Sequence, residues 1–284
     1  MKTVAVLGAG IMGAGIAQVA AEGGYNVLLR DLQMSLVNDG LTTIANNLES
    51  AVKKGRLQNR QKSEIFERIH GTTDLAELKH ADLVIEAVIE NMAVKKQIFT
   101  ELDNNCGSET ILATNTSSLS ITEIASVTKC KERVLGMHFF NPVPAVQLVE
   151  LVRGLETSDQ TIGNARHFVE TIGKESVVVN HETPGFIVNR ILIPYINEAI
   201  TAFGEGIASR EEIDKAMKLG TGTPMGPLEL ADMIGLDTLY SVILVFYNEF
   251  KDSKYRPHPI LSTMVRAGYY GKKSGKGFYD YTDK

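Results

Sequence analysis

The sequence has 284 residues, of which 44% are hydrophobic and 22% charged, a composition typical of soluble globular proteins and unlike that of disordered chains. Its formal net charge of −5 argues against a surface specialised for nucleic acid or for anionic lipid. The two cysteines, Cys106 and Cys130, have no CxxC spacing, so neither a metal cluster nor a disulfide framework is predicted.

The first residues lead directly into an apolar run at residues 4–8, which leaves no room for a charged leader or a hydrophobic signal segment. No apolar run approaches the roughly 20 residues that a bilayer-spanning helix needs. We therefore expect an untargeted cytoplasmic protein that binds no metal and has neither nucleic acid nor a membrane as a partner.

Short β-rich runs alternate with helical patterns over the first two thirds of the chain. This alternation indicates an α/β domain of the Rossmann type, doubly wound, with a mostly parallel sheet and crossover helices. The predicted strands are residues 4–8, 27–30, 83–86, 111–114, 133–137, 146–152 and 177–179. Between the second and third runs, a long polar helical stretch over residues 34–54 and 62–69 is predicted as a helical insertion that could project from the sheet.

The strand pattern stops after residue 179, and a helical pattern begins at Thr183 and Pro184, which suit the N-cap and the first helical position. Since single cores seldom grow past roughly 250–300 residues, the length favours two domains. We predict a Rossmann domain over residues 1–182 and a small all-helical domain over residues 183–284, with breaks at Gly and Pro between its helices.

A GxGxxG motif joins the first predicted strand to a helix of small residues. Its residues are Gly8, Gly10, Ile11, Met12 and Gly13. Glycines at these positions permit a tight turn, close approach of a pyrophosphate to backbone N–H groups and close packing of helix on strand. Because the motif stands between a strand and a helix, it favours dinucleotide binding over a merely structural turn.

An acidic residue, Asp31, ends the second strand 18 positions after Gly13. A carboxylate here can accept hydrogen bonds from the adenosine ribose hydroxyls and would repel a 2′-phosphate. The sequence therefore favours NAD as cofactor over NADP. The neighbouring Arg30 points the other way, since an arginine at this corner can accommodate a phosphate.

Several motifs resemble those of the L-3-hydroxyacyl-CoA dehydrogenase family, in particular its short stand-alone members, over essentially the whole chain. They read GAGIMGAGIA, ATNTSSLSI, GMHFFNPVP, ETPGFIVNR, KLGTGTPMGPLEL and GKKSGKGFYDY. HFFNP followed by PGFIVNR is far more specific than the glycine motif. The resemblance implies reversible NAD-dependent oxidation of a short (S)-3-hydroxyacyl-CoA, such as 3-hydroxybutyryl-CoA, to a 3-ketoacyl-CoA, such as acetoacetyl-CoA.

By this resemblance His138 is the general acid/base, Glu150 orients it, and Ser117 and Asn189 hydrogen-bond the reacting oxygen of the substrate or its neighbourhood. The chemistry is consistent with these roles. Oxidation of a secondary alcohol needs a base for the hydroxyl proton while the nicotinamide accepts a hydride from the same carbon. A carboxylate on the far ring nitrogen would fix the tautomer of the imidazole and stabilise the imidazolium.

Each assignment has a structural alternative. Glu150 could be an exposed strand residue paired with Arg153, although its neighbours in the sequence are apolar. Ser117 or Ser118 could cap a helix over residues 120–125, and only the alignment with the family selects Ser117.

Asn189 shares a helix face with isoleucines, four, seven and eleven positions on, where a buried amide needs a partner. That partner could be the substrate or a group of the other domain. The polar stripe of the same helix is predicted at Arg190, Asn197 and Thr201.

The resemblance also implies ligands for the nicotinamide half of the cofactor and for coenzyme A. The first set is Glu90, Lys95, Asn115, Ser117 and Asn141. The second set, for the coenzyme A phosphates, is Lys53 and Lys54 together with Arg56, although a solvated helix face would explain these cations equally well. Related enzymes pair through their helical domains, so a homodimer is expected. The sequence gives no physical account of the tail at residues 272–279.

Two rival functions are considered. The β-hydroxyacid dehydrogenases also join a Rossmann domain to a helical one but use a catalytic lysine, and here Asn189 and Arg190 are followed by apolar residues. The second rival is a relative that acts on sugar acids or that binds NAD without catalysis. The complete set of Ser117, His138, Glu150 and Asn189 argues against a loss of chemistry.

Overall fold

A computed structural model describes residues 1–282, and the chain divides into two compact units. The first unit is Met1–Thr183 and the second begins at Pro184, one residue after the predicted boundary. Each unit has its own hydrophobic core.

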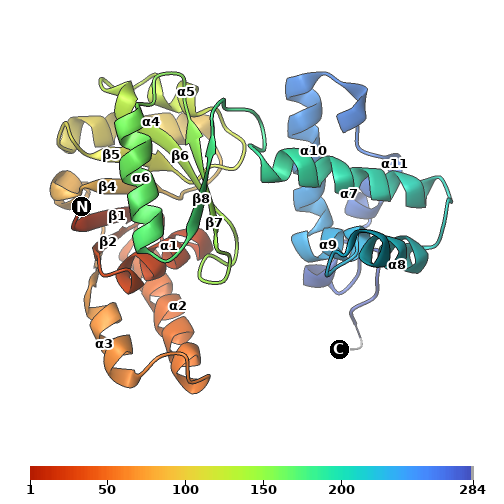
Figure 1. Ribbon diagram of the computed structural model, residues 1–284, viewed down its shortest axis with the longest axis horizontal. Helices are drawn as coiled ribbons and strands as arrows, with labels where there is room; N and C mark the ends of the chain where they lie inside the picture. Colours follow the sequence, from red (N-terminus) through yellow and green to blue (C-terminus); the bar gives the residue numbers. More distant parts are fainter. Residues whose placement is uncertain (283–284) are drawn as a thin grey trace. The chain divides into compact units, whose positions relative to one another are not determined.

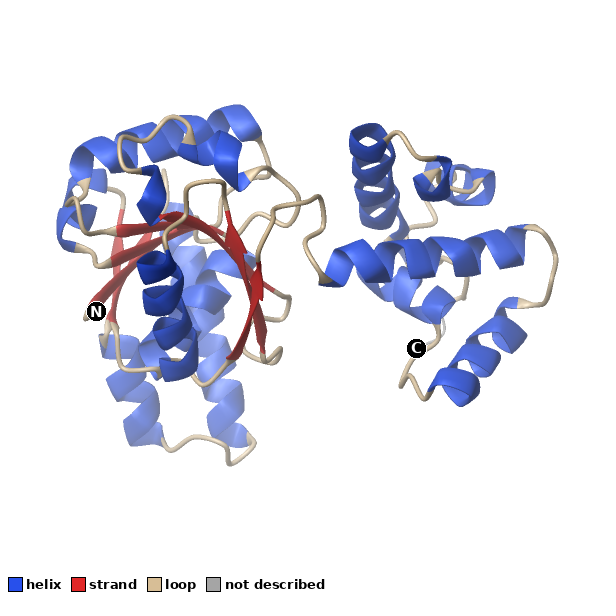
Figure 2. Cartoon of the chain, turned by 45° about the horizontal axis from the view of Figure 1, so that its top comes forward, coloured by secondary structure: helices blue, strands red, loops and turns tan. Residues whose placement is uncertain are grey.

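The first unit contains an eight-stranded sheet of order β3-β2-β1-β4-β5-β6-β7-β8. Figure 2 shows the strands of this sheet in red, with helices around them. Its strands are β1 (Thr3–Leu7), β2 (Asn26–Arg30), β3 (Ile69–Thr72), β4 (Leu83–Glu86), β5 (Ile111–Thr114), β6 (Val134–Phe139), β7 (Leu148–Arg153) and β8 (Glu175–Val179). The chain winds outward from β1 in both directions, so the strand order reverses between β1 and β4, where open α/β sheets bind their ligands. The structure confirms the doubly wound, mostly parallel sheet.

Two strands differ from the prediction. β3 was not predicted. The helical pattern predicts a helix as far as residue 69, but Ile69–Thr72 pairs with β2 at the edge of the sheet. Only two of its four residues are buried, too few for a periodic pattern to stand out. β7 runs antiparallel to β6, whereas all other neighbours are parallel. The connection between them is short, and a parallel return needs a dozen or more residues.

The helices of the first unit are α1 (Ile11–Glu22), α2 (Met34–Lys53), α3 (Asn59–Glu67), α4 (Met92–Asn105), α5 (Ile121–Ala125) and α6 (Asp159–Thr171). α2 and α3 form the predicted insertion, and their far ends extend past the sheet (Figure 1). α1 lies so close to its neighbours that a Cβ on Gly15 would come within 2.8 Å of Val143. The absence of a side chain at Gly15 therefore permits this packing.

The second unit consists of α7 (Val188–Gly204), α8 (Arg210–Thr221), α9 (Pro227–Ile234), α10 (Leu236–Phe250) and α11 (Pro259–Arg266), with short 3₁₀ turns between some of them. The polar stripe predicted on α7 is largely covered within the unit. Asn197 is only 5% exposed and donates a hydrogen bond to the carbonyl of Arg256. The guanidinium of Arg190 lies 3.8 Å above the ring of Phe250. Other elements of the unit therefore cover part of this polar stripe.

No single helix among residues 1–282 has the length and apolar composition to cross a membrane. α9 and α10 meet these criteria only as a pair, and they are bent by 98°.

The tail that the sequence left unexplained winds around a buried carboxylate, Asp232. Its two oxygens accept hydrogen bonds from the backbone N–H groups of Phe278 and Tyr279, at 2.9 and 2.8 Å. A Cβ on Gly277 would lie 2.0 Å from the same carboxylate, and Gly271 has a φ of +89°. The glycines of GKKSGKGFYDY thus let the backbone close around Asp232, and burial raises the pKa of that carboxyl.

A second buried carboxylate, Asp214, ties the tail to α9. It accepts hydrogen bonds from the first N–H groups of the helix, those of Leu228 and Glu229, and from the hydroxyl of Tyr279 at 2.8 Å. A Cβ on Gly226 would collide with Asp214 at 2.2 Å. The GPLEL and GFYDY motifs therefore both contact Asp214, and these contacts account for the residues of both motifs without a ligand.

Candidate active site

His138 and Glu150 are direct cross-strand partners. The antiparallel register of β6 and β7 sets His138 opposite Glu150, and such partners present their side chains on the same face of a sheet. The imidazole Nδ1 lies 2.7 Å from Glu150 Oε2. β6 extends to Phe139, so His138 lies within the strand and not after it as predicted. Glu150 lies next to the imidazole because β7 runs antiparallel to β6.

Burial strengthens this pair. Glu150 is 0% exposed and His138 is 6% exposed, so solvent screens their interaction little. A carboxylate only accepts hydrogen bonds, so the imidazole presents Nδ1–H to it. The alternative that paired Glu150 with Arg153 is wrong, because Arg153 bonds Asp159 and the carbonyl of Thr157.

The loop after β5 carries the predicted serine and lies at the same edge of the sheet. Asn115 Oδ1 accepts a hydrogen bond from the backbone N–H of Phe139, the residue after His138, at 2.8 Å. The N-cap of α5 is Ser120, whose hydroxyl accepts from the N–H of Glu123. Neither Ser117 nor Ser118 therefore caps this helix, and the alternative that gave them a capping role is wrong.

Glu90, from the loop between β4 and α4, forms hydrogen bonds with the loop after β5, residues 115–118, which we call the serine loop. Its Oε1 accepts hydrogen bonds from the hydroxyl of Thr116, the backbone N–H of Ser117 at 3.2 Å and the hydroxyl of Ser118 at 3.1 Å. Two residues assigned to the cofactor site, Glu90 and Ser117, are thus joined by a direct hydrogen bond. The other oxygen of Glu90 lies 3.5 Å from the ammonium of Lys95.

Lys95 is buried to a degree that the sequence does not suggest. It is 1% exposed, and its ammonium lies 2.7 and 2.8 Å from the two oxygens of Glu86. Glu86 is also fully buried, at the end of β4, and no site prediction included it. The available signal was an acid inside the apolar run LVIEAV, where a charge needs a partner.

The glycine loop has the geometry that a dinucleotide needs. Gly8 has a φ of +94°, and a Cβ there would lie 2.5 Å from the carbonyl oxygen of Ala87. In the described part of the chain, the first turn of α1 has neither a side-chain cap nor an acidic residue. Its N–H groups, including those of Ile11, Met12 and Gly13, thus form a site suited to an anionic pyrophosphate.

Asp31 lies beside this loop. Its Oδ2 accepts a hydrogen bond from the N–H of Ala9 at 2.7 Å, and its Oδ1 accepts from the N–H of Leu32. Arg30 Nε lies 3.4 Å from the carbonyl of Thr73, at the end of β3. The acid is therefore held at the nucleotide loop, while the arginine has a backbone partner of its own. The loop and Asp31 together fit NAD.

The remaining predicted residues are Asn141, Lys53, Lys54 and Asn189. Asn141 is exposed just after β6, and Lys53 and Lys54 are exposed at the end of α2, where Lys53 lies 3.8 Å from Glu49. Asn189 is half-buried in the first turn of α7, in the second unit, so its role remains a prediction. Among residues 1–282, no group of three or more His, Cys, Asp or Glu side chains is arranged to hold a metal ion.

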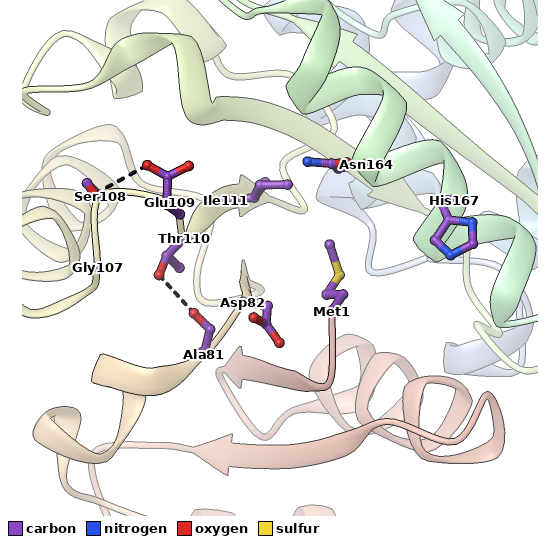
Figure 3. Close-up of a pocket in the computed structure, with 10 residues that line it drawn as sticks. All are labelled: Met1, Ala81, Asp82, Gly107, Ser108, Glu109, Thr110, Ile111, Asn164 and His167. Atoms are coloured by element: carbon purple, nitrogen blue, oxygen red, sulfur yellow. Dashed lines mark hydrogen bonds between the residues drawn. The ribbon is translucent and has the colours of Figure 1, made fainter.

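A hollow of about 380 Å³ lies at the opposite edge of the sheet (Figure 3). Its lining includes Asp82 and Thr110, which precede β4 and β5, and His167 of α6. The hydroxyl of Thr110 donates to the carbonyl of Ala81 at 2.8 Å, and Asp82 accepts from backbone N–H groups at the start of β1. Because doubly wound sheets bind ligands at the carboxyl ends of their strands, this hollow is not the candidate active site.

Two family models match the chain in succession. Residues 3–183 match the model of the 3-hydroxyacyl-CoA dehydrogenase NAD binding domain, and residues 185–281 match that of the 3-hydroxyacyl-CoA dehydrogenase C-terminal domain. The chain belongs to the 3-hydroxyacyl-CoA dehydrogenase family. As a 3-hydroxyacyl-CoA dehydrogenase it is an oxidoreductase that uses NAD.

Members of the family resemble this dehydrogenase from end to end. A Bacillus subtilis protein described as a probable 3-hydroxybutyryl-CoA dehydrogenase is 50% identical over 284 residues, 100% of this chain and 99% of that protein. A 3-hydroxybutyryl-CoA dehydrogenase of Clostridioides difficile is 50% identical over 98% of this chain and 99% of its own length. The crystal structure of (S)-3-hydroxybutyryl-CoA dehydrogenase from Ralstonia eutropha has a TM-score of 0.96 and 49% identity, with 100% of both chains covered.

Proposed function

We propose that the protein catalyses the reversible oxidation of short (S)-3-hydroxyacyl-CoA thioesters, 3-hydroxybutyryl-CoA above all, to 3-ketoacyl-CoA. The observation that carries this proposal is the buried His138–Glu150 pair at the carboxyl end of the sheet, linked through Phe139 and Asn115 to the serine loop. The names of the relatives support the choice of a four-carbon substrate.

In this proposal the cofactor lies along the switch point between β1 and β4. The N–H groups of the first turn of α1 hold the pyrophosphate, and Asp31 binds the adenosine ribose. Glu90, Asn115 and Asn141 hold the nicotinamide half. NAD held by these residues would supply the acceptor for the hydride of the carbon that bears the hydroxyl, and NADH would supply the hydride in the reverse direction.

The protein residues handle the proton. In oxidation, neutral His138 takes the proton of the substrate hydroxyl on Nε2 as the hydride leaves the same carbon, so that a C=O bond forms. The Glu150 carboxylate stabilises the resulting imidazolium and keeps the ring in place. The hydroxyl of Ser117 and the amide of Asn189 donate hydrogen bonds to the substrate oxygen. In reduction, protonated His138 returns the proton to that oxygen.

The remaining parts of the proposal concern partners. Lys53 and Lys54, exposed at the end of α2, bind phosphates of coenzyme A. Two copies of the chain associate through their helical units, where Ile191, Ile207 and Leu219 are exposed apolar side chains that an interface would cover. A cytoplasmic location, as expected from the sequence, is part of the same proposal.

A rival that uses a catalytic lysine on α7 is not supported, because Val188–Gly204 contains no lysine. The test is a substrate comparison that follows NADH absorbance. Acetoacetyl-CoA should be reduced, whereas free acetoacetate should react far more slowly and 6-phosphogluconate should not support reduction of NAD. Turnover of 6-phosphogluconate, or no turnover of the thioester by a folded protein that binds NADH, would refute the proposal.

A further inference from the structure

Glu86 joins three elements through one buried carboxylate. Its Oε1 accepts hydrogen bonds from the backbone N–H of Val88 and from Lys95, both at 2.7 Å. Its Oε2 accepts from Lys95 at 2.8 Å and from the hydroxyl of Thr114 at 2.7 Å. The side chain thus connects the loop after β4, the first turn of α4 and the end of β5. A charge buried this completely persists in a fold only when it is paired and hydrogen-bonded.

The contacts continue from Glu86 to the serine loop. The Lys95 ammonium that pairs with Glu86 also lies 3.5 Å from Glu90 Oε2. Glu90 in turn accepts the backbone N–H of Ser117 through its other oxygen, at 3.2 Å. A carboxylate, an ammonium and a second carboxylate therefore form one chain of contacts that ends on the backbone of the residue assigned to the substrate oxygen.

We propose that Glu86 is a positioning residue for Ser117 and for the nicotinamide half of the cofactor site, acting through Lys95 and Glu90. This inference rests on the proposed function, which gives Ser117 and Glu90 their ligands. In this scheme Lys95 does not serve mainly as a cofactor ligand. Its buried ammonium is held by Glu86, and it orients Glu90 from the protein side.

Neutralising Glu86 should displace Glu90. In Glu86→Gln the side chain keeps its size, but an amide nitrogen replaces one oxygen that accepts hydrogen bonds. Of the two carboxylates within 4 Å of Lys95, only Glu90 keeps its charge, so the ammonium draws it away from Ser117. Misplacement of binding groups by about 1 Å can cost up to about 100-fold in rate. We expect NADH affinity and kcat each to fall by about 10-fold to 100-fold.

Two further variants separate positioning from stability. Asp103→Asn breaks another buried ion pair of the same unit, Asp103–Arg133, which joins α4 to the residue just before β6. The double variant Glu86→Gln/Lys95→Met removes both charges of the Glu86–Lys95 pair, so neither charge is left buried and unpaired. Neutral replacement of a whole buried pair often restores stability, whereas loss of one partner lowers it strongly.

The experiment measures Tm, the Kd of NADH by fluorescence titration without thioester, and kcat for acetoacetyl-CoA reduction. Glu86→Gln should weaken NADH binding and lower kcat, and the double variant should recover Tm without recovering either. Asp103→Asn should lower Tm and leave the Kd and kcat unchanged. If Glu86→Gln does not fold, the double variant alone decides the matter.

The proposal is overturned if folded Glu86→Gln keeps the wild-type Kd and kcat, or if the double variant regains both together with its Tm. The same shifts in Asp103→Asn would also overturn it, because they would show a general effect of stability. A wild-type protein that binds NADH but does not reduce acetoacetyl-CoA would refute the proposed function. The NADH titrations of the variants would still decide the role of Glu86.

Discussion

The Glu150→Gln variant tests the pairing of the imidazole with its carboxylate in quantitative terms. The substitution keeps the shape of the side chain but removes its charge and puts an amide against Nδ1, which lies 2.7 Å from Glu150 Oε2. With charge centres about 4 Å apart and an effective dielectric constant of about 20, an imidazolium and a carboxylate attract by about 4 kcal/mol. Loss of this attraction raises the barrier of the step that forms the imidazolium.

At about 1.36 kcal/mol for each factor of ten, the change corresponds to a loss of about 10³-fold in the rate of hydroxyacyl-CoA oxidation. The amide NH₂ also favours the tautomer with its proton on Nε2, which cannot accept the substrate proton. The assay is kcat at saturating NAD and thioester, with NADH affinity and Tm as controls. A folded Glu150→Gln enzyme that retains a tenth or more of wild-type turnover would refute this reasoning.

Three further predictions concern the side chains of His138, Asp31 and Tyr279. Alcohol oxidation should accelerate as pH rises and ketone reduction should slow, because the first needs neutral His138 and the second its protonated form; parallel profiles in the two directions would contradict this role. Asp31→Ser should reduce the preference for NAD over NADP in kcat/KM, and unchanged discrimination would move the determinant elsewhere. Burial and the bond to Asp214 raise the pKa of the Tyr279 phenol, and burial beside Asp232 raises that of Tyr281. Since the phenols ionise more readily in the unfolded chain, the stability they contribute is complete below about pH 10 and declines above it. Chemical denaturation across this range should show a shallower decline in Tyr279→Phe, and an unchanged slope would exclude this phenol as the cause.

The fold was largely predictable because its strands are apolar runs that alternate with helices. The pattern gave seven of the eight strands, and the eighth, β3, is a four-residue edge strand with two buried positions. Strand direction was harder to predict. Nothing in the composition of β7 marks it as antiparallel, yet its direction sets Glu150 opposite His138.

The site was predictable where a motif has a local geometry, as in the glycine loop and the acid that ends β2. It was less predictable where a side chain acts through distant partners. Glu86 is 28 positions from Thr114, and both became visible as partners only when β4 and β5 were paired. For the same reason the sequence offered no role for the tail glycines, which lie against Asp232, and it could not show that Asn197 donates a hydrogen bond to the carbonyl of Arg256.

The most direct measurement of the central claim is single-turnover reduction of acetoacetyl-CoA by the His138→Gln enzyme loaded with NADH. If the imidazole supplies the proton, the rate should fall by about 10²- to 10⁴-fold, while the Kd of NADH stays close to that of the wild type. A His138→Gln enzyme that reduces the thioester at nearly the wild-type rate would show that another group carries the proton.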